Sequence, residues 1–82
     1  MLELLQQAEK RIVGIKQTEK AVLRGQAETV FIAADADDRV TSKLQQLCQE
    51  QSIRLVTELT MQEIGRACGI QVKAGAAVIL KD

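Results

Sequence analysis

A short apolar run in the middle of the chain constrains the fold more than any other feature. Val30-Phe31-Ile32-Ala33-Ala34 follows Glu28 and Thr29 and is rich in β-branched residues. Such a continuous run is typical of a strand that is covered on both faces. Phe31, the only aromatic residue of the sequence, is therefore predicted to lie in the core.

Helical and extended patterns alternate along the whole chain. In chain order, the predicted elements are a helix over residues 2–10, an extended segment over 11–13, a helix over 14–25, the strand over 28–34, a helix over 39–51, a strand over 53–59, a short helix over 60–69 and a strand over 72–80. Four repeats of helix and strand predict a single domain over residues 1–82. Its expected fold is a three-layer α/β/α sandwich around a four-stranded mixed sheet.

Local signals inside these elements set the expected packing. In the helix over residues 39–51, apolar side chains recur at offsets of four, seven and eight and are predicted to form a buried stripe of Val40, Leu44, Leu47 and Cys48. Thr60 and Glu63 have the spacing of a capping box, which predicts the start of a helix. Gly65, inside that helix, indicates a close approach by another part of the backbone.

The residues that the sequence lacks exclude most enzymatic chemistry. Histidine, the commonest general base, is absent. Cys48 and Cys68 cannot complete a tetrahedral zinc site without other soft ligands, so they are predicted to be buried apolar residues. The sequence contains no glycine-rich phosphate loop. We therefore expect no cofactor and no catalysis.

Three carboxylates, Asp35, Asp37 and Asp38, follow the apolar run. They suggest either a divalent-cation site or the cap of the helix that follows. Hard-cation loops usually supply more oxygen ligands and a spaced glycine, which favours capping by Asp37 or Asp38.

Membrane insertion and secretion are not expected. No apolar run approaches the roughly 20 residues that a membrane-spanning helix needs. The first residues lack the basic segment and clean apolar run of a signal peptide. A cytoplasmic protein is expected, and the sequence has no heptad seam that would demand a dimer, so we expect a monomer.

Positive charge is concentrated between residues 10 and 24. This stretch holds five cations and one anion, a net charge of +4, whereas the rest of the chain holds six cations and ten anions, a net charge of −4. Lys16, Lys20 and Arg24 recur every four residues and so share one face of the helix between Gly14 and Gly25. The first turn of a helix also favours an anion. Lysines with this spacing more often form a solvated surface, but the concentration of positive charge narrows that preference and is typical of a phosphate-facing helix.

Three segments resemble the signature blocks of the L7Ae family of ribosomal proteins, and they are most similar to its small bacterial, YbxF-like members. The segments read GIKQTEKA from Gly14, AADAD from Ala33 and IGRACGI from Ile64, in the family's order and spacing. The resemblance covers nearly the whole chain. It implies an α/β/α fold and the binding of kink-turn RNA, a bent helix–internal loop–helix motif with tandem sheared G·A pairs, in the ribosome or in another structured RNA.

The resemblance also implies a role for the basic helix. Its members that would enter the widened major groove at the G·A pairs are Gly14, Lys16, Gln17 and Lys20. Lysine donates to guanine O6 and N7, and the glutamine amide both donates and accepts. Arg24, with Lys10 and Arg11, is expected to contact phosphates without reading sequence.

A second set of residues is implied to meet a flipped-out loop nucleotide. Asp37 matches a position near that nucleotide, and the segment of Ile70, Gln71, Val72 and Lys73 matches the one that packs against it. Ile70 and Val72 are as easily explained as core residues.

Two positions depart from the family pattern. The family often has Asn-Glu where this chain has Lys16-Gln17, although its bacterial branch resembles this chain. The usual proline is replaced by Asp38, which brings a negative charge close to the proposed RNA surface.

The leading hypothesis is a non-catalytic protein that binds kink-turn RNA. Two other interpretations are a protein–protein adaptor of the same fold with an acidic partner, and a metal-dependent hydrolase that uses the three aspartates.

Overall fold

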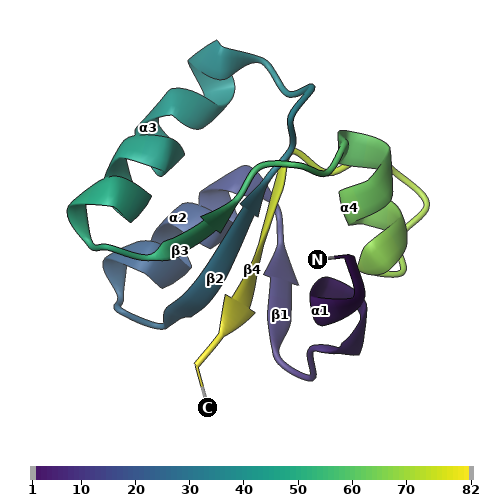
Figure 1. Ribbon diagram of the computed structural model, residues 1–82, viewed down its shortest axis with the longest axis horizontal. Coiled ribbons are helices and arrows are strands. Elements are labelled where there is room, and N and C mark those ends of the chain that lie inside the picture. The colour runs from purple at the N-terminus through teal and green to yellow at the C-terminus, as the bar shows by residue number, and fades with distance from the viewer. Residues whose placement is uncertain (1, 82) are drawn as a thin grey trace.

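The computed structural model describes residues 2–81 and consists of four helices that alternate with four strands (Figure 1). In chain order the elements are α1 (Leu2–Gln7), β1 (Arg11–Val13), α2 (Ile15–Leu23), β2 (Ala27–Ile32), α3 (Asp38–Glu50), β3 (Arg54–Val56), α4 (Met61–Ala67) and β4 (Ala76–Leu80). The predicted alternation of helix and strand is confirmed. No helix within residues 2–81 is long and apolar enough to span a lipid bilayer.

The four strands form one mixed sheet in the order β1-β4-β2-β3. Strands β2 and β3 are parallel, whereas β4 runs antiparallel to both of its neighbours, β1 and β2. Val78, in the middle of β4, lies opposite Ile12 on one side and Val30 on the other. The fourth strand in the sequence therefore lies in the interior of the sheet.

Successive side chains of β2 point to opposite faces of the sheet, as the period of a strand requires. Phe31 is fully buried in a core that it shares with Leu5 of α1 and Ile64 of α4. Val30 and Ile32 belong to a second core, which α2 and α3 cover. Helices α1 and α4 thus cover one face of the sheet and α2 and α3 the other, which confirms the predicted three-layer sandwich.

The starts of α3 and α4 have the side-chain caps that the sequence predicts. Asp37 Oδ1 accepts a hydrogen bond from the backbone N–H of Arg39 at 2.9 Å. Thr60 Oγ1 accepts from the Glu63 N–H at 3.2 Å, and Glu63 Oε1 accepts from the Thr60 N–H at 3.0 Å. Both of these helices therefore begin with their exposed backbone donors partly satisfied.

Three helices end in the same left-handed turn. The residues that adopt it have φ angles of +70° at Gly25, +55° at Ser52 and +74° at Gly69. At each position, this residue and the next donate backbone hydrogen bonds of 2.9 to 3.2 Å into the last turn, which is the Schellman arrangement. Ser52 is the only residue other than glycine with a positive φ within residues 2–81.

Helix α1 ends at Gln7, three residues earlier than predicted. Its end is capped by the Arg11 guanidinium, whose Nη1 donates at 3.2, 2.9 and 3.3 Å to the carbonyl oxygens of Leu5, Gln6 and Ala8. Arg11 was expected to contact phosphates. In the structure its Nη1 is occupied by the C-terminal carbonyl groups of α1, and a phosphate contact by Arg11 stays a prediction.

The buried stripe of α3 is rotated by about one residue from the predicted one. Val40 is 50% exposed, whereas Thr41 is 1% exposed. Leu44 and Cys48 are fully buried, as predicted. The buried stripe therefore starts at Thr41, with offsets of three and seven residues to Leu44 and Cys48, and this period is helical.

The last two strands are shorter than predicted. Strand β3 covers only Arg54–Val56, and β4 begins at Ala76, so residues 72–75 form a loop instead of a strand. The loop is diverted towards α4, because the Ala74 N–H donates to the Met61 carbonyl oxygen at 3.1 Å instead of joining the sheet.

Candidate functional site

Strands β1, β2 and β3 run in the same direction and finish at one end of the sheet, called here the carboxyl end (Figure 1). Helices α2, α3 and α4 follow these strands and begin there. The loop of residues 68–75 also lies at this end, because it leads into the start of β4. Since the first turn of a helix carries partial positive charge, three helix starts favour anions at the carboxyl end.

The start of α2 differs from the other two because it has no side-chain cap within the described part of the chain. Its N-cap residue is Gly14, with φ +117° and ψ 148°. Gly14 is anchored on both sides: its N–H donates to Ala76 O and its carbonyl accepts from Thr18 N–H, each at 2.9 Å. Helix α2 therefore presents an uncapped first turn in a fixed position.

Gln17 lies over Gly14. A Cβ at position 14 would collide with Gln17 Oε1 and would lie 3.2 Å from Gln17 Cδ. Position 14 therefore requires glycine for two reasons: its φ is left-handed, and the Gln17 amide occupies the space where a Cβ would lie. This side chain is exposed at the start of the helix, where it is available to a ligand.

The cations of α2 face solvent and its anion does not. Lys16, Lys20 and Arg24 are exposed, and none of them makes an ion pair within residues 2–81. The Glu19 side chain is only 19% exposed, and its Oε2 lies 4.0 Å from Lys43 Nζ on α3. The helix thus turns its negative charge towards its neighbour and leaves a positive face to solvent.

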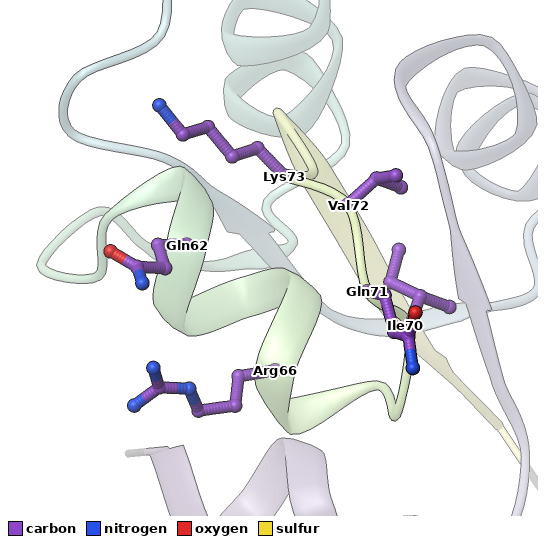
Figure 2. Close-up of a pocket in the computed structure, with 6 residues that line it drawn as sticks. All are labelled: Gln62, Arg66, Ile70, Gln71, Val72 and Lys73. Atoms are coloured by element: carbon purple, nitrogen blue, oxygen red, sulfur yellow. The ribbon is translucent and has the colours of Figure 1, made fainter.

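A cavity of about 520 Å³ separates α4 from the loop that follows it (Figure 2). It is lined by Gln62, Arg66, Ile70, Gln71, Val72 and Lys73. The last four were predicted as site residues, whereas Gln62 and Arg66 were missed. Their spacing of four residues, which puts both on one face of a helix, was a signal for a pair, and Arg66 lies inside the third signature block.

The loop of residues 70–73 is held closely against α4. The carbonyl oxygen of Val72 fills the space where Gly65 has no side chain, which confirms the predicted close approach. The Ile70 N–H donates to Gly65 O at 3.1 Å. Ile70 is half-buried and packs against the core, whereas Val72 is 68% exposed. The core interpretation therefore holds in part for Ile70 and not for Val72.

The acidic cluster caps helices, as predicted. Asp35 Oδ1 accepts from the Met61 N–H of α4 at 2.8 Å. Asp37 Oδ2 pairs with Arg39 Nη2 at 3.0 Å, and this hydrogen bond, with that of the Arg39 backbone N–H, holds the pKa of Asp37 below its ordinary value. Within residues 2–81 no three histidine, cysteine, aspartate or glutamate side chains are grouped so as to hold a metal ion.

The carboxyl end brings most of the predicted site residues together. The backbone of Gly75 packs against Ile15, since a Cβ at position 75 would lie 2.8 Å from Ile15 Cδ1. The loop therefore lies beside the start of α2, and Asp37 begins α3 at the same end. Arg24 is not part of this group, because it lies about 12 Å further along the helix axis than Lys16.

Comparisons with known proteins agree with this architecture. The model of the ribosomal protein L7Ae/L30e/S12e/Gadd45 family matches residues 1–82. An RNA-binding protein of Caldanaerobacter subterraneus is 48% identical over 68 residues, which are 83% of each chain. The RNA-binding protein YbxF of Geobacillus stearothermophilus is 37% identical over 79 residues, 96% of each chain. Among solved structures, the 15.5kD RNA binding protein of Giardia lamblia has a TM-score of 0.88 and 33% identity, over 99% of this chain and 71% of that one.

Proposed function

This chain belongs to the ribosomal protein L7Ae/L30e/S12e/Gadd45 family, and we propose that it is a non-catalytic RNA-binding protein that recognises and stabilises kink-turn motifs. Its target is a cytoplasmic structured RNA, ribosomal or regulatory, which it binds as a monomer. The relatives named as RNA-binding proteins support an RNA partner rather than an enzymatic role. The observation that carries the proposal is the uncapped start of α2, where Lys16, Gln17 and Lys20 face solvent.

The shape of the RNA decides whether this helix can be used. Regular A-form RNA has a deep, narrow major groove that side chains do not read. A kink opens that groove, so α2 can enter it with its amino end first. Lys16 and Lys20 then donate to guanine O6 and N7, and Gln17 donates and accepts at a neighbouring base edge.

Shape is also the main source of specificity, because the chain has no net charge. Non-specific affinity for nucleic acid comes from many phosphate contacts, and it grows with each one. A good bidentate contact to a base contributes roughly 1–3 kcal/mol. The protein therefore binds straight duplexes weakly and stabilises the kinked form by binding it preferentially.

The experiment compares a short kink-turn RNA with the same RNA in which Watson–Crick pairs replace the sheared G·A pairs. The affinities of the unaltered protein, Gln17→Ala and Lys20→Ala are measured for both by isothermal titration calorimetry. Lys81→Ala is the matched control, since it removes an exposed cation just beyond the far end of β4. We expect tight binding to the kink-turn alone, weakened about tenfold or more by each α2 variant and unchanged by the control.

Equal binding to both RNAs, or binding to neither, would overturn the proposal. The adaptor with an acidic protein partner would then be the better interpretation of the exposed cations on α2.

A further inference from the structure

Glu19 is the one carboxylate in the basic stretch of residues 10–24. Positions three and four residues apart are neighbours on the surface of a helix. The neighbours of Glu19 on α2 are therefore residues 15, 16, 22 and 23, and Lys16 is the only cation among them. By spacing alone, the Glu19 carboxylate would pair with Lys16 and neutralise a cation that the proposed function assigns to the RNA.

The structure pairs this carboxylate with a different helix. Helices α2 and α3 pack against each other on one face of the sheet, and both begin at its carboxyl end (Figure 1). In the seam between α2 and α3, Glu19 Oε2 lies 4.0 Å from Lys43 Nζ of α3, and the Glu19 side chain is only 19% exposed. Lys16 makes no ion pair within residues 2–81. The carboxylate is thus paired across the seam, and the cation of its own helix is left to solvent.

Lys43 has no acidic neighbour on its own helix. The residues three and four positions away from it are 39, 40, 46 and 47, and none of them is acidic. At the start of α3, Asp37 is already paired with Arg39 at 3.0 Å. At the end of α3, Glu50 already accepts a hydrogen bond from Gln46 at 3.2 Å. Lys43 is therefore free to attract the carboxylate of the neighbouring helix.

The pairing depends on Lys43 because the seam is a poor place for an unpaired carboxylate. Moving an ionised carboxylate out of water is costly unless a cation or hydrogen bonds accompany it. Lys43 supplies the cation, and its own side chain is 73% exposed, so it keeps most of its hydration. Without Lys43, the Glu19 carboxylate would leave the seam for solvent. Lys16 is then the cation that the geometry of α2 puts within its reach.

We infer that Lys43 is a positioning residue for RNA binding, because it holds the Glu19 carboxylate in the seam and leaves the Lys16 ammonium free for the RNA. The inference rests on the proposed function in taking RNA as the ligand of α2. It adds two residues, Glu19 and Lys43, that set the affinity without touching the RNA. Since Lys43 acts through Glu19, its effect disappears when residue 19 carries no charge.

The first test is a double-mutant cycle on the whole protein, with affinities for the kink-turn RNA and its Watson–Crick counterpart measured at one salt concentration. We expect Lys43→Ala to weaken kink-turn binding about fivefold and Lys43→Arg to retain most of it. Lys81→Ala, which removes another exposed cation, should have no effect. Glu19→Gln should bind at least as tightly as the unaltered protein, and adding Lys43→Ala to it should cause no further loss. Thermal unfolding checks that every variant is folded.

The cycle separates the inference from the proposed function. A loss of the same size with Glu19 and with Gln at position 19 would overturn the inference, since Lys43 would then contact the RNA directly. The absence of any loss in Lys43→Ala would overturn it as well. Equal binding of the unaltered protein to both RNAs refutes the proposed function. In that case the inference stands if Lys43→Ala weakens binding to both RNAs only while Glu19 is present, and it falls otherwise.

The second test needs no RNA, so it decides the inference even for a protein that binds neither RNA. Nuclear Overhauser contacts of the Glu19 γ-methylene protons are measured by NMR in the unaltered protein and in Lys43→Ala. We expect contacts to the ε-methylene protons of Lys43 in the former and to those of Lys16 in the latter. Contacts to the Lys16 ε-methylene in the unaltered protein, or none to it in Lys43→Ala, would overturn the inference.

Discussion

The carbonyl oxygen of Val72 lies where the side chain of residue 65 would be, and only Gly65 leaves room for it. This contact joins a residue inside α4 to the exposed tip of the loop that follows. It sets the distance between the two walls of the cavity, and it keeps residues 72–75 out of β4.

Gly65→Ala is expected to destabilise the protein by about 1–3 kcal/mol, since the added methyl group must displace backbone atoms. Urea unfolding followed by circular dichroism measures this change. Helix propensity alone predicts the opposite sign, a gain of about 0.5–1 kcal/mol for alanine within a helix. An increase in stability would therefore show that the loop yields easily.

Gly14→Ala is expected to impair both stability and RNA binding. The substitution forces alanine into a φ of +117° and displaces the Gln17 amide from the start of α2. We expect a loss of about 1–3 kcal/mol of stability and a clear loss of kink-turn affinity. Gly25→Ala is the matched control, because it has a positive φ but open space around a Cβ, so it should cost only about 1 kcal/mol and leave RNA affinity unchanged.

Ser52→Gly is expected to stabilise the protein by about 1 kcal/mol. Ser52 adopts φ +55° at the end of α3, a conformation that costs a non-glycine residue about 1–2 kcal/mol, partly offset by the greater freedom of glycine in the unfolded chain. The melting temperature should rise by about 4–8 °C. Ser42→Gly, at an exposed position within α3, should lower it instead, and a fall in both variants would contradict the prediction.

Thr18→Val is expected to leave stability unchanged or to raise it. Thr18 is fully buried in α2, and its Oγ1 has no hydrogen-bond partner within the described chain. Removing an unsatisfied buried hydroxyl removes a desolvation cost. Thr41→Val provides the contrast, since Thr41 Oγ1 donates to Asp37 O at 3.4 Å. This variant should lose about 0.5–1.5 kcal/mol of unfolding free energy. A large loss of stability in Thr18→Val would indicate that its hydroxyl does have a partner.

The Asp37 carboxyl group should titrate below its ordinary pKa of 3.8. Its charged form is favoured first by the Arg39 side chain and then by the Arg39 N–H. Because the folded pKa is lowered, the stabilising contribution is present above the ordinary pKa and is lost as pH falls through the folded one. NMR titration of the carboxyl carbon measures it, and Arg39→Ala should raise the pKa. An unchanged pKa of Asp37 in that variant would show that the side-chain pair between Asp37 and Arg39 has no effect on this carboxyl group in solution.

Local signals in the sequence were sufficient for most of the fold. The run around Phe31, the caps at Asp37 and Thr60 and the glycines after α2 and α4 each depend on neighbouring residues, and each was predicted. The start of β4 depends on a contact between Val72 and Gly65, and Val72 itself has the β-branched side chain of a strand residue. Such a long-range contact overrides a local preference.

The resemblance to the family supplied the candidate residues of α2 and of the loop of residues 70–73. Gln62 and Arg66 were not predicted, because they line a cavity that forms only when the loop folds against α4. Lys16, Gln17 and Lys20 share one helix, so their common face follows from spacing. Arg66 lines a cavity together with residues of a loop whose path no periodicity reveals. The hydrogen bonds of Arg11 escaped prediction for a related reason, because the carbonyl groups it caps become its neighbours only when β1 turns back along α1.

The position of β4 in the sheet has a consequence for synthesis of the chain on the ribosome. Within the described residues 2–81, residues 76–80 are translated after every other strand, yet they supply the only neighbour of β1 and one of the two neighbours of β2. The hydrogen bond from the Gly14 N–H to Ala76 O, which fixes the start of α2, also cannot form until Ala76 has been synthesised. A nascent chain that has not yet reached β4 therefore carries α2 without the contact that fixes its start. Under the proposed function, we expect it to bind RNA through α2 only after β4 has left the exit tunnel and inserted between β1 and β2.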